Sequence, residues 1–300
     1  MIRQLVINAD DFGLTGGINE GIVAAYDGGV LTSASLFANA PATADAIRLS
    51  RSRPSLGIGA HLTLVDGAPT LSARQIPSLV TDDGRFRPSW RPFIVACLRG
   101  RVVLADVEQE LTAQIERLQD AGVALTHLDA HKHVHAYPPI FAIVARLALR
   151  FGVPVVRVPY EQRPSISWGE EETPTRRTAR YQAWLNAAMW PWARRNYGTA
   201  ASLGLRTPRF AGRIHTGVLS RSALRALIRA MRPGVTELMV HPGFLDAALA
   251  ATGTRLLQSR ETELALLCGL ETRAVLARER IELVRHDLAH PARRSFRHVS

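Results

Sequence analysis

The sequence predicts an α/β protein with a deformed (β/α) barrel of seven or eight mostly parallel strands in a single domain. Short β-branched apolar runs alternate with longer segments of helical period, and this order favours parallel strands joined by right-handed crossovers. At 300 residues and 47% hydrophobic, the chain can bury a large core. A doubly wound open sheet is the alternative, but no G-x-G-x-x-G sequence follows the first strand.

The expected strands are apolar and rich in β-branched residues. They cover Gln4–Ala9, Leu31–Phe37, Gly57–Leu64, Leu125–Ala130, Val153–Val158, Phe210–His215, Thr236–Val240 and Arg280–Val284. The expected helices cover Gly16–Asp27, Thr43–Arg51, Ala105–Ala121, Pro138–Phe151, Thr178–Tyr197, Ser220–Met231 and Ser259–Ala277. The barrel then spans residues 1–285, with a tryptophan-rich insertion around 160–210, and residues 286–300 are expected to form a frayed basic tail.

Composition narrows the class of protein. No run approaches the roughly 20 apolar residues that span a bilayer, and the N-terminus lacks a signal-peptide pattern, so we expect a cytoplasmic protein. Cys97 and Cys268 lie far apart, which argues against a disulfide framework or a thiolate metal site. The net charge of +11 would suit an anionic partner, but 37 basic residues, of which only Lys132 is lysine, are spread along the chain. We therefore expect no nucleic acid partner, and leave weak attraction to acidic phospholipid open.

Two aspartates close the first expected strand, in ADDFG at Ala9 to Gly13. The chemistry of a (β/α) barrel gathers at the carboxyl ends of its strands, so polar residues there are candidates for a site. Adjacent carboxylates cost free energy unless a cation or a shared proton offsets their repulsion. The alternative is that Asp10 or Asp11 caps the following helix or forms a turn with Gly13.

A third strand end contributes His61, in GAHLTL. A single histidine in an apolar strand is more often a core residue than a ligand. Asp11, His61 and His131 together, however, supply one carboxylate and two imidazoles from three strand ends. Such a set can hold one divalent ion and leave positions open for water and substrate.

The segment HLDAHKHVHAYPP is unusually rich in histidine, and His131 lies nearest the end of its strand. If the chain stayed extended, His131, His133 and His135 would share one face, but a single metal cannot take all three. We expect His131 to be the ligand and Asp129 to orient it. His133 and His135 then belong to the loop before the next helix, where they line a substrate groove or are solvated.

Two further strand ends carry candidates. Arg157 ends the fifth expected strand, where it supports the site or lines the substrate groove. His241 ends an apolar strand in MVHPGF, just before a Pro-Gly break. Its imidazole would face the metal across the barrel mouth, or else it is a strand-terminal histidine in a turn.

The tryptophans are unevenly distributed. All but Trp90 lie in one segment, at Trp168, Trp184, Trp190 and Trp192. The pattern is typical of a core-packed helix broken at Pro191. It also fits an aromatic lid or a membrane-interface surface, with Trp184, Trp190 and Trp192 as candidate lipid or lid contacts.

Four motifs, NADDFG, IGAHLTL, THLDAHKHVH and MVHPGF, occur in order between about Met1 and Val284, and together they resemble the YdjC-like carbohydrate deacetylases, which include the chitooligosaccharide deacetylases. The phrases LTSASLFANAP, LVDGAPTL, LVTDDGRF and VRVPYE resemble the hopanoid-biosynthesis-associated branch. The resemblance implies a deformed (β/α) barrel and one divalent ion, Mg²⁺ or Zn²⁺, bound by Asp11, His61 and His131. It further implies Asp10 as general base and His241 as acid. Many relatives have another histidine where this chain has Lys132, a position that strand alternation would turn away from the metal.

The resemblance implies a metal-dependent hydrolase that removes the acetyl group of an N-acetylglucosamine-type sugar. For the hopanoid branch, the implied substrate is N-acetylglucosaminyl bacteriohopanetetrol, and the enzyme would make peripheral contact with the inner membrane face. The alternatives are a chitooligosaccharide deacetylase acting on soluble sugars, a metal-dependent phosphoesterase or amidohydrolase, and a sugar-binding protein without catalysis.

Overall fold

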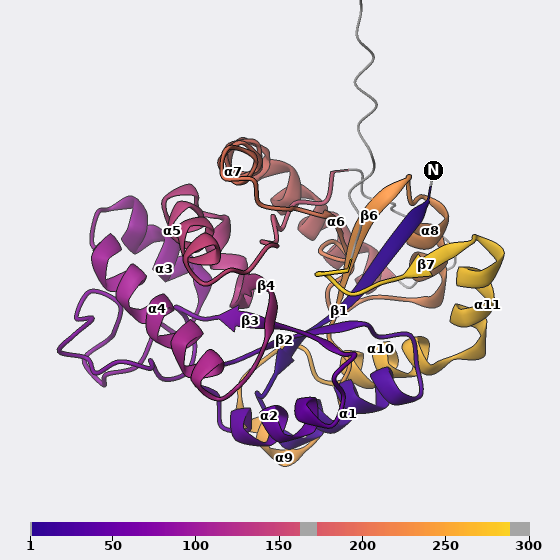
Figure 1. Ribbon diagram of the computed structural model, residues 1–300, viewed down its shortest axis with the longest axis horizontal. Coiled ribbons are helices and arrows are strands. Elements are labelled where there is room, and N and C mark those ends of the chain that lie inside the picture. The colour runs from indigo at the N-terminus through magenta and orange to yellow at the C-terminus, as the bar shows by residue number, and fades with distance from the viewer. Residues whose placement is uncertain (1, 163–172, 289–300) are drawn as a thin grey trace, which may run out of the picture.

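A computed structural model describes residues 2–162 and 173–288. Its central feature is one curled sheet of parallel strands in the order β4-β3-β2-β1-β6-β5, with β7 paired to β1 (Figure 1). The strands are β1 (Arg3–Phe12), β2 (Ser33–Leu36), β3 (Gly57–Leu62), β4 (Leu125–Ala130), β5 (Arg209–Ala211), β6 (Gly234–Val240) and β7 (Ile281–Leu283). The predicted deformed (β/α) barrel is confirmed.

The barrel is irregular between β4 and β5. The expected strand over Val153–Val158 is reduced to two parallel bridges, which join Leu128 to Val156 and Val155 to Arg206. The expected strand over Phe210–His215 ends early, because Gly212 turns the chain with a φ of +97°. The sheet therefore curls through short pairings here instead of through a full strand.

Helices surround the sheet (Figure 1). They are α1 (Gly16–Asp27), α2 (Thr43–Arg51), α3 (Trp90–Leu98), α4 (Leu104–Asp120), α5 (Pro138–Arg150), α6 (Thr173–Ala188), α7 (Trp190–Ser202), α8 (Arg221–Arg229), α9 (Ala247–Ala251), α10 (Gln258–Cys268) and α11 (Leu270–Arg278), with a 3-10 helix η1 (His131–Ala136). The Thr15 side chain caps α1 by accepting from the Ile18 amide, and proline occupies the first turn of α5, where no helical donor is lost.

Three helical segments differ from the sequence prediction. The segment expected over Thr178–Tyr197 begins earlier, at Thr173, and ends later, at Ser202. Its interruption at Met189, which separates α6 from α7, agrees with the expected break at Pro191. The segment expected over Ser259–Ala277 is divided at the extended Gly269. Helix α3 was not expected at all. Prolines and glycines inside apolar periodic segments thus determine where these helices end.

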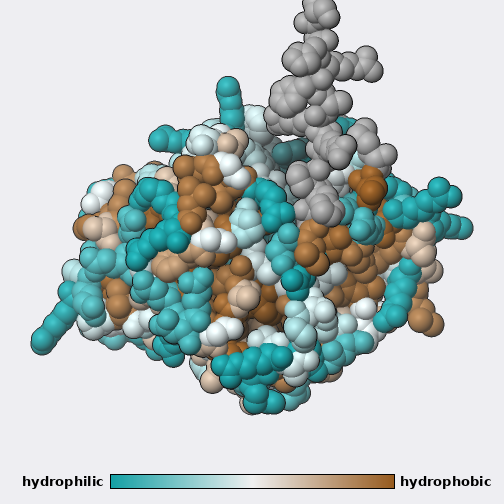
Figure 2. Space-filling view, viewed as in Figure 1, coloured by the Kyte–Doolittle hydropathy of each residue, from teal (hydrophilic) through white to brown (hydrophobic). Residues whose placement is uncertain are grey.

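The expected tail is described only at its beginning. The ring of His286 lies 3.9 Å from that of His127, and His286 is buried. From residue 289 onward the expected tail lies outside the described residues. On the face seen in Figure 2, hydrophobic patches alternate with hydrophilic side chains, so hydrophilic residues do not cover it as one continuous surface.

Glu161 fastens α6 to the barrel. The Asn186 side chain accepts from the Glu161 amide at 3.0 Å and donates to the Glu161 carbonyl at 2.9 Å. The Glu161 carboxyl is buried and accepts from the Ile214 amide at 3.3 Å. Burial raises the pKa of this carboxyl to about 7. The residue whose backbone binds α6 therefore also carries a buried carboxyl group that titrates near neutral pH and accepts from the segment after β5.

This raised pKa predicts a pH-dependent stability. The unfolded chain loses the Glu161 proton near 4.5 and the folded chain near 7, so the stabilising contribution is complete below 4.5 and is lost as pH rises through 7. The loss is at most about 3 kcal/mol in the free energy of unfolding. We expect Glu161→Gln to become progressively more stable than the natural protein between about pH 5 and pH 8 in urea denaturation. Stability curves that stay parallel over this range would contradict the assignment.

Candidate active site

A bulge at the end of β1 allows Asp10 and Asp11 to share the barrel interior. Ala9 pairs with Ala34 and Phe12 with Leu36, so β1 holds one more residue than β2 over this stretch. Asp11 has a φ of 70°, a conformation uncommon outside glycine. Both carboxylates are buried. Since neighbours on a regular strand face opposite sides, the bulge explains how the adjacent aspartates serve one site.

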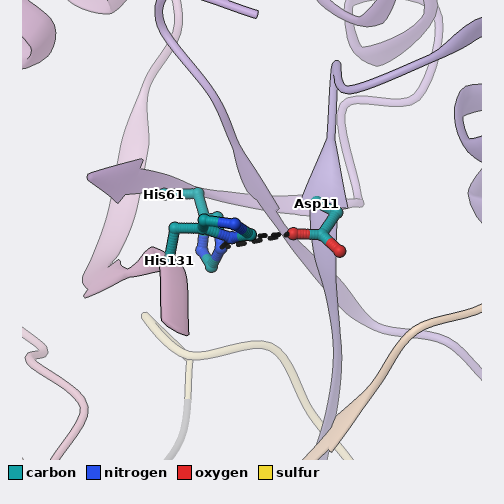
Figure 3. Close-up of side chains that lie close together, drawn as sticks. All are labelled: Asp11, His61 and His131. Atoms are coloured by element: carbon teal, nitrogen blue, oxygen red, sulfur yellow. Dashed lines mark hydrogen bonds and ion pairs between the residues drawn. The ribbon is translucent and has the colours of Figure 1, made fainter. Parts of the chain in front are cut away.

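Asp11, His61 and His131 converge from β1, β3 and the start of η1 (Figure 3). Asp11 Oδ1 lies 3.6 Å from His61 Nε2 and 3.2 Å from His131 Nδ1. The two imidazole nitrogens are 3.3 Å apart. Within the described chain, Asp11 Oδ1 accepts no hydrogen bond. The structure thus brings together the three residues that the sequence analysis singled out as metal ligands.

The spacing of these three atoms fits a divalent ion. Ligands about 2.1 Å from one metal are separated by roughly 3.0 Å in octahedral and 3.4 Å in tetrahedral geometry. The observed separations of 3.2, 3.3 and 3.6 Å are close to this range. One unpaired carboxylate oxygen and two imidazole nitrogens form a suitable donor set for Zn²⁺ or Mg²⁺.

The charges around the site also favour a cation. Among the described residues, the buried carboxylates of Asp10, Asp11, Asp129 and Glu237 contact two buried guanidinium groups, those of Arg157 and Arg260. Burial would lower the pKa of His61, but the charge of Asp129, the close contact with Asp11 and the hydrogen bond with Asp129 raise it to about 10. The site therefore attracts positive charge, which a divalent ion would supply in place of a proton.

Each of the two histidines has a carboxylate at its other nitrogen. His61 Nδ1 lies 2.7 Å from Asp129 Oδ1, and Ser35 donates to the second oxygen of Asp129 at 2.7 Å. His131 Nε2 lies 3.8 Å from Asp66 Oδ2. Asp129 therefore orients His61 and not His131, contrary to the expectation, because β3 and β4 pair His61 directly with Asp129. Asp66 was not among the residues expected at the site.

The histidine-rich segment does not stay extended. Lys132 and His133 have φ values of 50° and 56°, and the chain coils into η1. The three alternate histidines consequently do not share a face. The His133 ring packs edge-on against Phe210 at 5.7 Å, and the exposed Lys132 pairs with Asp66. Because this segment is not a strand, alternation does not determine where Lys132 points. Its ammonium group pairs with Asp66 and not with the three ligand residues.

His135 supports the site from beneath. It is fully buried, its Nε2 lies 2.9 Å from the Arg157 carbonyl oxygen, and burial lowers its pKa to about 4. A neutral imidazole can donate from this nitrogen to the carbonyl. His135 is therefore not solvated, and its contact helps to fix the position of Arg157.

Arg157 connects several of the buried carboxylates. Its two terminal nitrogens donate to the two oxygens of Asp10, each at 2.7 Å. Nη2 also lies 2.8 Å from Asp129 Oδ2, and Nε donates to Glu237 Oε1 at 2.8 Å. Burial raises the pKa of Asp10, but the charges of Arg157 and His61, together with the hydrogen bonds from Arg157, lower it below its usual value. Asp10 is thus held as an anion. Glu237 was not expected at the site, and the only sign of it in the sequence is a charged residue within an otherwise apolar strand.

Helix α10 supports the opposite side of the site. The His241 amide donates to Glu263 Oε2 at 2.5 Å, and Arg260 donates to Asp11 Oδ2 at 2.5 Å. Burial lowers the pKa of His241 to about 4, although the charges of Asp11 and Asp10 act in the opposite direction. His241 is therefore neutral near pH 7. Arg260 and Glu263 were not expected at the site, because charged residues near the start of a helix usually face solvent.

The tryptophan candidates make their ring contacts with tyrosines. Trp190 is 49% exposed and lies 5.4 Å from the Tyr160 ring, whereas the half-buried Trp192 lies 5.4 Å from Tyr137. Trp184 is 65% exposed. Trp168 lies outside the described residues. A role of these side chains as lid or lipid contacts stays a prediction.

Comparisons with known proteins agree with this geometry. Residues 4–278 match the sequence profile of a family described as YdjC-like protein. The chain is 34% identical over 286 residues to a carbohydrate deacetylase of Brevibacillus brevis, covering 94% of this chain and 97% of that protein. It is 34% identical over 285 residues to a carbohydrate deacetylase of Geobacillus stearothermophilus, covering 95% and 97%. A solved structure from Enterococcus faecalis V583, provisionally described as a cellobiose-phosphate cleavage protein, has a TM-score of 0.76 and 25% identity, covering 97% of this chain and 100% of that chain.

The geometry predicts one divalent ion per chain, which isothermal titration calorimetry of metal-stripped protein will measure. We expect His131→Ala to weaken binding by more than about 100-fold, since loss of a mere supporting partner of a ligand already costs 10- to 100-fold. His133→Ala is the matched control, because this histidine is two residues away but outside the ligand group. Equal losses in the two variants would rule out the assigned ligands.

Proposed function

Because the chain belongs to the YdjC-like protein family, we propose that it is a carbohydrate deacetylase that hydrolyses the acetamide of an N-acetylglucosamine-type sugar with the help of one divalent ion. The observation that carries this proposal is the unpaired Asp11 oxygen facing two imidazole nitrogens, with the anionic Asp10 beside it. Metal ligands next to a carboxylate base are the arrangement that metal-assisted amide hydrolysis requires.

Asp11, His61 and His131 would hold the ion, which when bound polarises the acetamide carbonyl and lowers the pKa of the attacking water. Asp10 is the proposed general base. Its Oδ1 accepts from Arg157 and Asn8, whereas Oδ2 accepts from Arg157 alone. Since a carboxylate oxygen has two lone pairs, Oδ2 keeps one to receive the proton of the water.

His241 is the proposed acid for the departing amine. Because burial lowers its pKa to about 4, this imidazole starts the reaction neutral and must gain its proton during turnover. The proton that leaves the water is the available source. Its delivery to the sugar nitrogen as the carbon–nitrogen bond breaks yields acetate and a free amine. Glu263, bonded to the His241 amide, holds the backbone of this residue in place.

A narrower proposal concerns the substrate. Helices α6 and α7 carry the exposed Trp184 and Trp190 and four exposed arginines, Arg177, Arg180, Arg194 and Arg195. The range Thr173–Ser202 contains no acidic residue. Aromatic rings flanked by arginines suit the headgroup region of an anionic membrane. None of the helices in the described parts of the chain is long and apolar enough to cross a bilayer. These features favour peripheral contact and a lipid-linked sugar such as N-acetylglucosaminyl bacteriohopanetetrol.

Acetate release tests the activity directly. We expect metal-loaded protein to release acetate from N-acetylglucosaminyl bacteriohopanetetrol, and Asp11→Ala to lower the rate by at least about 100-fold through loss of a metal ligand. Release from diacetylchitobiose instead would assign the chain to the soluble chitooligosaccharide deacetylases. No acetate from either compound, together with phosphate release from sugar phosphates, would replace the proposal with a phosphoesterase.

The exposed tryptophans test the lipid-linked substrate. We expect the double variant Trp184→Ala, Trp190→Ala to lose about tenfold in turnover of the lipid-linked sugar in anionic vesicles, because insertion of aromatic area into the interface would be removed. Turnover of diacetylchitobiose should stay unchanged. Trp192→Ala, which alters a half-buried ring of the same segment, is the control. Equal losses on both substrates would count against a membrane-facing role.

A further inference from the structure

We infer that Arg260 of α10 is a positioning residue that presents Asp11 to the divalent ion through a single oxygen. The inference rests on the metal site of the proposed function. Nothing in the motifs points to Arg260, because it is 249 positions from Asp11 in the chain. Contact between the two side chains arises only when α10 closes against the end of β1.

Arg260 is fixed at two points. Its Nη2 donates to Asp11 Oδ2 at 2.5 Å, and its Nε donates to the Leu256 carbonyl at 3.0 Å. The Arg260 side chain is 1% exposed and that of Asp11 is 4% exposed. A guanidinium group is planar, so two anchored nitrogens define the orientation of the whole group. The direction from which it holds the carboxylate is therefore set by α10.

This contact makes the two oxygens of Asp11 unequal. The terminal torsion of an aspartate is broad and roughly two-fold, so a free carboxylate exchanges its oxygens easily. Arg260 occupies Oδ2, whereas Oδ1 accepts no hydrogen bond in the described structure and faces His61 and His131. Asp11 thus offers one oxygen to the ion before the ion arrives, which lowers the entropic cost of binding.

Gly243, the glycine of the HPG motif, leaves the space that Arg260 uses. A Cβ at Gly243 would lie 3.3 Å from Arg260 Cδ and 3.2 Å from Ile18 Cγ1. Gly21 of α1 packs directly against this loop, since a Cβ at Gly21 would lie 2.4 Å from the Gly243 Cα. Because α1 approaches the loop after β6 so closely, a larger residue at position 243 would press on both Ile18 and the Arg260 side chain.

The direction in which a substitution at position 260 changes metal affinity distinguishes a positioning role from a purely electrostatic one. A cationic side chain next to a metal ligand repels the ion, so charge alone predicts that a neutral residue at position 260 strengthens metal binding. Loss of orientation predicts the reverse. For Arg260→Gln we expect the metal dissociation constant to rise about 10- to 100-fold, as is usual when the partner that orients a ligand is lost. Arg260→Lys keeps the charge but lacks the planar fork, and should show a smaller rise.

The experiment is zinc and magnesium titration of metal-stripped full-length protein by calorimetry, with circular dichroism to verify folding. Arg221→Gln is the control, because Arg221 is 70% exposed and pairs only with the surface Glu271. Methylguanidinium should restore part of the metal affinity of Arg260→Gly, a rescue that a general packing defect would not show. If Arg260→Gln fails to fold, Arg260→Lys decides by the same measurement.

An unchanged or smaller dissociation constant in a folded Arg260 variant would overturn the inference, as would a natural protein that binds neither metal. Failure of the proposed function gives a different result. In that case, the natural protein binds metal and loses affinity in Arg260→Gln, yet releases no acetate from any acetylated amino sugar.

Discussion

The buried ion pairs of Arg157 are the interaction on which the rest of the site depends. From the irregular segment after α5, this one side chain binds Asp10 on β1, Asp129 on β4 and Glu237 on β6. Buried charges are costly unless they are paired and hydrogen-bonded, so the carboxylates and the guanidinium can only be buried together. Because Asp129 in turn orients His61, the network reaches from the sheet to a proposed metal ligand. The curled sheet and the site are therefore one structural unit.

The buried negative charges of this network outnumber its buried positive charges. Arg157 and Arg260 balance two of the four buried carboxylates, and the remaining negative charge acts on the imidazoles. Without an ion, it raises the pKa of His61 to about 10 despite burial. Filling the same space with further arginine would stabilise the carboxylates but leave nothing to attract a cation. The electrostatic imbalance is thus the property that a metal-dependent hydrolase needs, and the fold tolerates it because each of these carboxylates accepts at least one hydrogen bond from a buried side chain.

The sequence predicted the parts of the site that follow from strand ends. Asp11, His61 and His131 each lie where an apolar run stops, so the barrel rule alone brought them together. Partners joined through tertiary structure were beyond this reasoning. Arg260 approaches Asp11 from a helix near the other end of the chain, and Asp129 selects His61 through the register of two parallel strands. The same limit applies to the fold. The strands, most helices and the break at Pro191 were expected, whereas the breaks at Gly212 and Gly269 were not.

Strained backbone conformations explain how the side chains of the site are positioned without a long regular strand. Among described residues other than glycine, five have positive φ, and four of these, Asp11, Asp66, Lys132 and His133, are a proposed ligand or lie beside His131 in space or in the chain. Such conformations cost of order 1–3 kcal/mol each and persist only where surrounding contacts fix them. Here the contacts are the charged pairs themselves, Arg260 with Asp11 and Lys132 with Asp66. The positive-φ turns orient these side chains, and the ion pairs that the side chains form stabilise the turns in return.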